Sequence, residues 1–230
     1  MNLKSSEKYA PAAFEDLVFP SPTVERTIRD YKDGHTTENL LLYGPPGTGK
    51  STIARLIPAL VEPNYCPGDV TVYHCGIFRK VEELQNKIGK QIPLYANGDR
   101  RYLILEEVDN LNVHAMQMLK SIMDIGQKVD ALFVLTTNEV DNVSKPVIDR
   151  CEKVYVGLTS PEHWLSRARS IIQQETGNLL SDDQLLQIIS TAKGSGRQTV
   201  KAIQKYLARR ARHQVAQISP ASARQKEDVV

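Results

Sequence analysis

The sequence predicts an α/β fold, in which a parallel five-stranded sheet with helices on both faces is followed by a small all-helical lid domain. Two observations support this prediction. Five short apolar runs alternate with helical patterns or polar loops, as is typical of a parallel sheet covered on both faces. After Gly157 the strand signals stop, and from Ser160 onward the apolar residues recur with the period of a helix.

The expected strands are the short apolar runs Leu40–Tyr43, Val70–Tyr73, Tyr102–Leu105, Ala131–Leu135 and Lys153–Val156. A helix is expected to begin at Thr52, and Pro58 is expected to disturb it because proline has no backbone N–H. Between the later strands, helices are expected at about Arg79–Gln91, Asn112–Ile125 and Lys145–Arg150.

The lid domain is expected to contain three helical segments, Ser160–Glu175, Ser181–Ala192 and Arg197–Val215. Ser160 offers an N-cap before Pro161, and the run from Ser181 to Gln184 resembles a capping box. The last segment has an apolar face formed by Val200, Ile203, Leu207 and Ala211. We therefore expect a sheet domain over residues 1–158, a helical lid over residues 159–216 and a disordered tail over residues 217–230.

The composition is that of an ordinary soluble globular protein. The chain has 230 residues and a formal net charge of +2, with 41% hydrophobic and 24% charged residues. No apolar run approaches the roughly 20 residues of a membrane-spanning helix, and the N-terminus has no apolar signal core. We expect no membrane partner and a cytoplasmic location, or a nucleoid or nuclear one depending on the source.

Cysteine spacing and charge distribution further limit the kinds of protein that this sequence can encode. Cys66, Cys75 and Cys151 are widely separated and fit neither a disulfide framework nor a paired zinc site, so we expect reduced thiols. Positive charge gathers between Lys205 and His213. A solvated helix face and a phosphate-binding surface would each explain this cluster.

The most informative motif is the run from Gly44 to Ser51, which fits the pattern GxxxxGK[ST] between an apolar strand and a helix. In this context glycines let backbone N–H groups surround phosphates, and the helix N-terminus adds partial positive charge. Lys50 is expected at the β- and γ-phosphates, and the Ser51 hydroxyl at Mg²⁺. The expected contacts to the nucleotide are Pro46, Gly47, Thr48, Gly49, Lys50, Ser51 and Thr52.

Polar residues follow the third and fourth expected strands, at the sheet edge where open α/β sheets bind ligands. Glu106 is expected to hold Mg²⁺ through water, and Glu107 to orient and polarise an attacking water. Asn138 is expected to bond both the γ-phosphate and that water. The run from Asn138 to Asp141 is similar to a guanine-reading motif, but Glu139 replaces its lysine, which disfavours a GTPase.

These residues resemble the AAA+ ATPases, and within them the clamp-loader branch typified by replication factor C small subunits. The resemblance spans residues 7 to about 210. The segments Glu7–Pro11 and Phe14–Val18 resemble the one that packs around adenine in that family, which implies contacts from Tyr9, Pro11 and Val18. Ala10 replaces the family's usual arginine.

The resemblance also implies two arginine roles. The segment Val147–Cys151 resembles the family's Ser-Arg-Cys segment, so Arg150 would be inserted into the ATP site of a neighbouring subunit, although Asp149 replaces the serine. The segment Gly194–Arg197 resembles the start of the third lid helix, so Arg197 would sense the γ-phosphate in its own subunit. The segment Asn112–Asp124 is similar to the helix that follows the acidic strand.

Two departures concern catalysis. The resemblance implies aspartate where Glu106 stands, and displacements on the order of 1 Å can slow catalysis, so the speed of hydrolysis stays open. His74 stands where clamp loaders often carry an asparagine that restrains the catalytic glutamate. It is expected either to restrain Glu107 or only to cap its strand.

The resemblance implies a homo- or hetero-oligomeric ATPase that loads or remodels a DNA replication or repair factor. It makes Arg79, Lys80 and Lys120 candidate DNA contacts, and structural salt bridges would explain these residues equally well. Two alternatives stay open, a protein-remodelling or adaptor ATPase without DNA contact and a nucleotide-locked structural subunit. Clamp-loader subunits carry a further helical collar domain beyond the lid. Its absence from this sequence indicates either a shortened relative or a piece of a longer protein.

Overall fold

The computed structural model describes residues 8–77, 85–89, 96 and 98–218. These residues form two compact units, one over residues 11–159 and the other over the helical segment from Ser160 onward together with residues 8–10. Residues 8–10 were expected in the sheet domain. They group with the helical unit because Lys8 pairs with Glu175 and the Tyr9 ring packs against the core of that unit.

The sheet unit contains five strands, β1 (Asn39–Tyr43), β2 (Val70–His74), β3 (Arg101–Glu106), β4 (Ala131–Thr137) and β5 (Cys151–Tyr155). Their order is β2-β3-β4-β1-β5, and every pairing is parallel. The predicted fold class is thereby confirmed, with strand ends close to those expected. The loop after β1 leads into α3 (Lys50–Val61), whose Lys50 bonds Asn138 just after β4.

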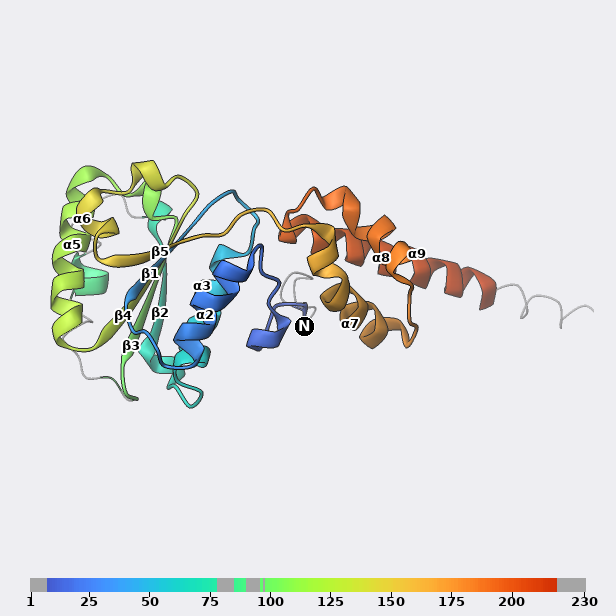
Figure 1. Cartoon of the computed structure of the whole chain (residues 1–230), viewed down its shortest axis with the longest axis horizontal. Coiled ribbons are helices and arrows are strands. Elements are labelled where there is room, and N and C mark those ends of the chain that lie inside the picture. Colours follow the sequence, from blue (N-terminus) through green and yellow to red (C-terminus); the bar gives the residue numbers. More distant parts are fainter. Residues whose placement is uncertain (1–7, 78–84, 90–95, 97, 219–230) are drawn as a thin grey trace, which may run out of the picture. The chain divides into compact units, whose positions relative to one another are not determined.

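Alternating residues of the central strands face two separate cores. Leu41, Leu103 and Phe133 face the core under α5 (Val113–Lys128) and α6 (Lys145–Ile148). Leu42, Ile104 and Val134 face the core under α2 (Pro22–Lys32) and α3 (Lys50–Val61). Figure 1 shows these helix pairs on opposite sides of the sheet. Because side chains alternate along a strand, continuous apolar runs serve both cores.

Two helices differ from the sequence expectation. α2 was not expected, although Ser21 caps it by accepting from the Val24 amide and Pro22 occupies its first turn. The expected disturbance at Pro58 is wrong, because α3 continues to Val61 with Pro58 buried inside it. Pro58 lies in the last turn of α3, where its missing N–H removes one bond, and its carbonyl still accepts from Glu62.

Short helical turns connect these elements in the described residues. They are η1 (Phe14–Asp16), η2 (Pro67–Asp69), η3 (Cys75–Ile77), η4 (Gln85–Gly89), η5 (Val108–Asn110) and η6 (Val140–Asn142). Of the helix expected at Arg79–Gln91, only the π-helical turn η4 falls within the described residues.

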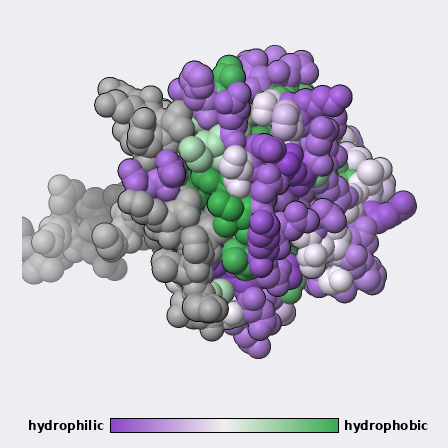
Figure 2. Space-filling model, turned by 90° about the vertical axis from the view of Figure 1, so that its left-hand side faces the viewer, coloured by the Kyte–Doolittle hydropathy of each residue, from purple (hydrophilic) through white to green (hydrophobic). Residues whose placement is uncertain are grey.

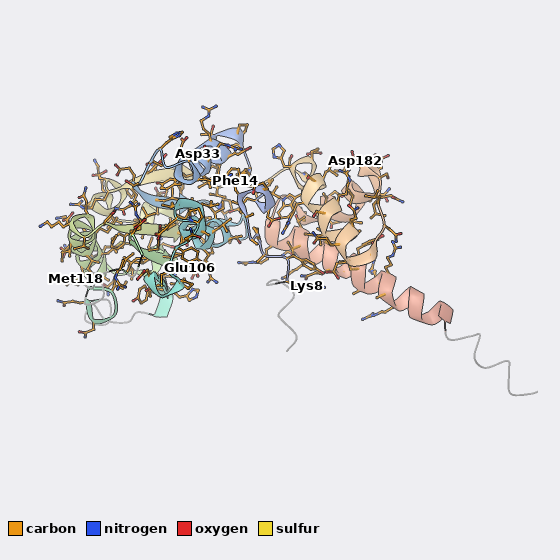
Figure 3. The ribbon with its side chains drawn as sticks, turned by 90° about the horizontal axis from the view of Figure 1, so that it is seen from below. Lys8, Phe14, Asp33, Glu106, Met118 and Asp182 are labelled. Atoms are coloured by element: carbon orange, nitrogen blue, oxygen red, sulfur yellow. The ribbon has the colours of Figure 1, made fainter. Side chains whose placement is uncertain are left out.

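The helical unit contains η7 (Pro161–Trp164), α7 (Leu165–Thr176), α8 (Asp182–Ile189), η8 (Ser190–Ala192) and α9 (Gly196–Ile218). Its core is built from Ala168, Ile171, Ile172, Leu185, Ile189 and Ile203. The expected capping box at the start of α8 is confirmed, because the Ser181 amide donates to the Gln184 side chain and the Gln184 amide donates to the Ser181 hydroxyl. Figure 3 labels Asp182, the first residue of this helix. α9 extends two residues into the expected tail, and residues 219–230 lie outside the described residues.

The surface on the α5 and α6 side is mostly hydrophilic, with one narrow hydrophobic strip (Figure 2). Among the described residues, no helix has the length and apolar character that crossing a membrane requires. The three cysteines are free thiols. Burial raises the pKa of Cys75 and of Cys151 to about 12 because the thiolate is poorly solvated there.

Candidate functional site

The loop between β1 and α3 depends on glycine at defined points. Gly44, Gly47 and Gly49 have φ values of 141°, 82° and 105°, which disfavour residues with a side chain. At Gly44 a Cβ atom would lie 2.4 Å from the carbonyl oxygen of Val156. Gly49 is also the N-cap of α3, so the loop leads directly into the free amides of a helix N-terminus. This geometry suits a bound anion.

Lys50 joins the loop to the end of β4. Its ammonium donates to the carbonyls of Gly44 and Pro45, each at 2.8 Å, and to Asn138 Oδ1 at 2.9 Å. Lys50 is 6% exposed, and Thr48 Oγ1 donates to the Pro45 carbonyl at 3.0 Å beside it. The structure therefore brings together two predicted site residues that lie 88 positions apart.

Glu106 lies at the end of β3, inside the sheet unit (Figure 3), and is 4% exposed. Arg55, in the second turn of α3, donates to Oε1 from Nε at 2.8 Å and to Oε2 from a terminal nitrogen at 3.1 Å. His74 Nδ1 lies 2.7 Å from Oε2. The bond to Glu106 raises the pKa of the Arg55 guanidinium above its usual value. Both carboxylate oxygens are thus engaged by nitrogen groups of the chain.

His74 contacts Glu106 in the structure. Two roles were left open for it, the restraint of Glu107 and the capping of its strand. β2 and β3 pair in a register that sets His74 beside Glu106, and His74 Nδ1 lies next to the Glu106 carboxylate. Paired residues of adjacent strands project to the same face of a sheet. The restraint of Glu107 by His74 stays a prediction, and this contact does not support it.

Glu107 leaves the strand direction. It has φ 58° and ψ 52°, a left-handed conformation that is uncommon for residues other than glycine, and its side chain is exposed. Its amide donates to Thr136 Oγ1 at 3.3 Å, and its carboxylate accepts from Asn110 Nδ2 at 3.4 Å. Because of this turn, the Glu107 carboxylate is exposed to solvent, whereas the Glu106 carboxylate is buried in an ion pair. A group that polarises an attacking water needs such exposure.

The residues near the loop differ in how well they suit Mg²⁺. The Ser51 hydroxyl lies exposed in the first turn of α3, beside the loop, and is a suitable oxygen donor. Glu106 fits poorly, because a cation would have to displace the two cationic or hydrogen-bonding partners that hold its carboxylate. In the part of the chain that the structure describes, no group of three or more His, Cys, Asp or Glu residues could hold a metal ion. The predicted metal role of Glu106 stays a prediction.

Arg150 follows α6 and is held by its own chain. Its Nε and one terminal nitrogen donate to the two oxygens of Asp124 at 2.6 and 3.3 Å, and its other terminal nitrogen donates to the Pro146 carbonyl at 2.7 Å. The hydrogen bond from Arg150 lowers the pKa of Asp124. Lys120, a predicted DNA contact, lies 3.6 Å from the same carboxylate. Arg79 and Lys80, the other two, lie outside the described residues.

The remaining predicted residues are divided between the two units. Pro11 and Val18 are half-buried in the sheet unit. Tyr9 packs against the core of the helical unit, where its carbonyl accepts from Arg167 at 3.4 Å. Arg197 is exposed in the first turn of α9. Their roles at the nucleotide stay predictions.

Two residues at the site were not predicted from the sequence. Arg55 stands five positions after Lys50 and neutralises Glu106, and Asp124 orients Arg150. The glutamate at position 106, where an aspartate was expected, was the sequence signal that could have indicated a partner such as Arg55. No local pattern marks Asp124, whose partner lies 26 positions away.

Residues 40–157 match the AAA family, described as the ATPase family associated with various cellular activities. The chain is 34% identical over 203 residues to a probable replication factor C subunit 2 of Dictyostelium discoideum, covering 86% of this chain and 59% of that protein. It is 30% identical to replication factor C subunit 4 of Schizosaccharomyces pombe, covering 88% and 59%. The chain thus spans about three fifths of these curated relatives.

Among solved structures, the chain is similar to the RuvB Holliday junction branch migration motor of Thermotoga maritima. The TM-score is 0.65 at 17% identity, and the match covers 85% of this chain and 64% of that one. At this identity the likeness concerns the fold alone.

Proposed function

The chain belongs to the AAA family of ATPases, and from this premise we propose that it is an oligomeric, ATP-driven switch that loads or remodels a DNA replication or repair factor. The observation that carries the proposal is the contact between Lys50 and Asn138 at 2.9 Å, because it joins the glycine loop to the residue that would position water and the γ-phosphate. The replication factor C relatives support the DNA-linked role.

In the proposed reaction, water attacks the γ-phosphate in line, and Glu107 polarises that water from its exposed position after β3. Lys50 and Asn138 stabilise the developing charge from the loop and the end of β4. Mg²⁺, held through the Ser51 hydroxyl, would supply further neutralisation of the phosphate oxygens. The adenine would contact Tyr9, Pro11 and Val18.

Two arginines complete the proposed site. Arg197 acts on the γ-phosphate of its own subunit, and Arg150 acts on that of a neighbour, so ATP binding promotes assembly of a homo- or hetero-oligomer. The bonds that Arg150 donates to Asp124 and to the Pro146 carbonyl support this role, because they fix the guanidinium while each terminal nitrogen keeps a second N–H for a phosphate. Hydrolysis removes the bridging contact and loosens the assembly.

The proposal is tested by measuring particle size and ATP turnover with ATP, with ADP and without nucleotide, each with and without primed DNA. We expect larger particles only with ATP, and turnover that rises with DNA and with protein concentration. Full turnover in a sample shown to be monomeric would contradict the shared site. Turnover that no form of DNA changes would favour the protein-remodelling or adaptor alternative.

A second candidate function is a nucleotide-locked structural subunit. The ion pair of Glu106 with Arg55 favours it, because this carboxylate is already neutralised within the chain. This candidate binds ATP and assembles but turns over no faster than a Glu107→Gln variant. Wild-type turnover clearly above that of Glu107→Gln would eliminate it.

A further inference from the structure

α9 carries an unbalanced positive charge. Its 23 residues, Gly196–Ile218, contain no aspartate or glutamate. Its cationic residues with described side chains are Arg197, Lys201, Lys205, Arg209, Arg210 and Arg212. A solvated helix face normally mixes charges of both signs, because like charges four residues apart destabilise a helix. The lack of any acid on this helix therefore needs an explanation outside the helix.

Four of these residues, Lys201, Lys205, Arg209 and Arg212, form what we call the basic ridge. At 3.6 residues per turn they fall within an arc of about 80° and extend over about 16 Å of the helix axis. All four are exposed. In the described part of the chain, no ion pair joins any of them to an acidic side chain. The basic ridge is thus a straight row of cations that neighbouring elements leave open.

The opposite face of α9 is already used. Ile203 is buried, and Tyr206 and Leu207 pack against the core of the helical unit. Arg210 lies on this side too, about 180° around the helix from Lys201, and donates to the Tyr206 hydroxyl at 3.3 Å. A helix that lies in a membrane surface must bury its apolar face in lipid. Because the apolar face of α9 serves the core, the basic ridge suits a polyanion in water.

We propose that the basic ridge binds the phosphate backbone of double-stranded DNA without reading base sequence. Backbone contacts need only cations at suitable spacing, and successive ridge residues four positions apart are separated by about 6 Å along the helix. Tyr206, the tyrosine of α9, packs against the core of the helical unit, whereas proteins that prefer single strands stack bases on aromatic rings. Bound phosphates would also relieve the repulsion between neighbouring cations.

This inference deepens the DNA association of the proposed function. Its test is therefore run without nucleotide, so that its failure leaves the ATPase proposal standing. Binding of the full chain to a short labelled duplex of mixed sequence is measured by fluorescence anisotropy at several salt concentrations. The ridge variant is Lys205→Gln/Arg209→Gln. The matched control is Arg210→Gln, which removes one charge from the other side of the same helix.

We expect the wild type to bind the duplex with a steep salt dependence. In the ridge variant, the slope of log K against log salt should fall in magnitude by about 0.9 for each charge removed. The control should keep the wild-type slope, and thermal melting should show that both variants stay folded. A base-sequence-independent affinity would support the assignment further.

Three results would overturn the proposal. The first is no duplex binding by the wild type at low salt. The second is an unchanged slope in the ridge variant, or an equal loss of slope in Arg210→Gln. The third is that single-stranded DNA or phosphatidylserine vesicles bind more tightly than the duplex, and that the ridge variant weakens this binding but leaves duplex binding unchanged.

Discussion

Arg55 Nε donates to Glu106 Oε1 at 2.8 Å, and this ion pair ties α3, which follows the phosphate loop, to the end of β3. Glu106 is buried, whereas the Arg55 side chain is 53% exposed. The pair therefore neutralises a buried carboxylate by means of a half-exposed cation.

Removing Arg55 should destabilise the sheet unit. We expect Arg55→Met to lower the free energy of unfolding by about 1–2 kcal/mol, a value reduced for the exposure of Arg55, because Glu106 loses two charged hydrogen bonds. Urea denaturation measures this loss. In the double variant Arg55→Met/Glu106→Gln the loss should be smaller than the sum of the single losses. A loss no larger than that of Lys8→Met, which breaks an exposed pair, would contradict the role of Arg55.

Glycine at position 44 should be indispensable. We expect Gly44→Ala to destabilise the protein by more than about 2 kcal/mol, because the new methyl group meets the Val156 carbonyl and φ is 141°. Gly34→Ala is the matched control, since Gly34 has φ 73° but nothing within 4 Å of the new atom. It should cost about 1 kcal/mol from backbone strain alone. Equal losses in the two variants, measured by denaturation, would show that the close approach at Gly44 has no effect.

Variants at Glu107 and Lys50 should have different effects on ATP binding and on ATP turnover. Glu107→Gln keeps the size of the side chain but removes the base, so we expect ATP turnover to fall by about 10²- to 10⁴-fold with ATP affinity nearly unchanged. Lys50→Ala should weaken ATP binding itself, because Lys50 lies in the loop. Calorimetric titration and a phosphate-release assay measure the two effects. Wild-type turnover by Glu107→Gln would remove Glu107 from the mechanism.

Asp124 should stabilise the protein only above acidic pH. Its folded-state pKa is lowered by Arg150, from an unfolded value of about 3.9. The stabilisation is therefore complete above the unfolded pKa and is lost as pH falls through the folded pKa. We expect the difference in melting temperature between wild type and Asp124→Asn to vanish on acidification. A difference that stays the same at every pH would contradict this role of Asp124.

Arg150 should matter between subunits. We expect Arg150→Ala to abolish the dependence of ATP turnover on protein concentration while nucleotide affinity stays within about twofold of wild type. Mixing Arg150→Ala with Lys50→Ala subunits should restore turnover at those interfaces where an intact loop meets an intact arginine. Undiminished cooperative turnover in Arg150→Ala would place the trans arginine elsewhere.

The sheet and the loop could be predicted because their signals are local. A run such as Ala131–Leu135 is apolar throughout because both of its faces are buried, and the loop motif fixes its own backbone through glycine. α2 was missed although Ser21 and Pro22 form an ordinary helix start, since its buried residues are few and spaced among charges. Pro58 was misjudged because a proline in the last turn removes only one bond.

The polar residues at the strand ends and the loop before α3 can be identified from the order of residues in the chain. Which of those residues pair with one another depends on the folded structure. The register of β2 against β3 sets His74 beside Glu106. Arg55 of α3 donates to the same carboxylate, and Arg150 donates to Asp124 of α5. The pairing of charged groups depends on the distance between them and on how far each is buried. Both depend on how elements far apart in the chain pack together.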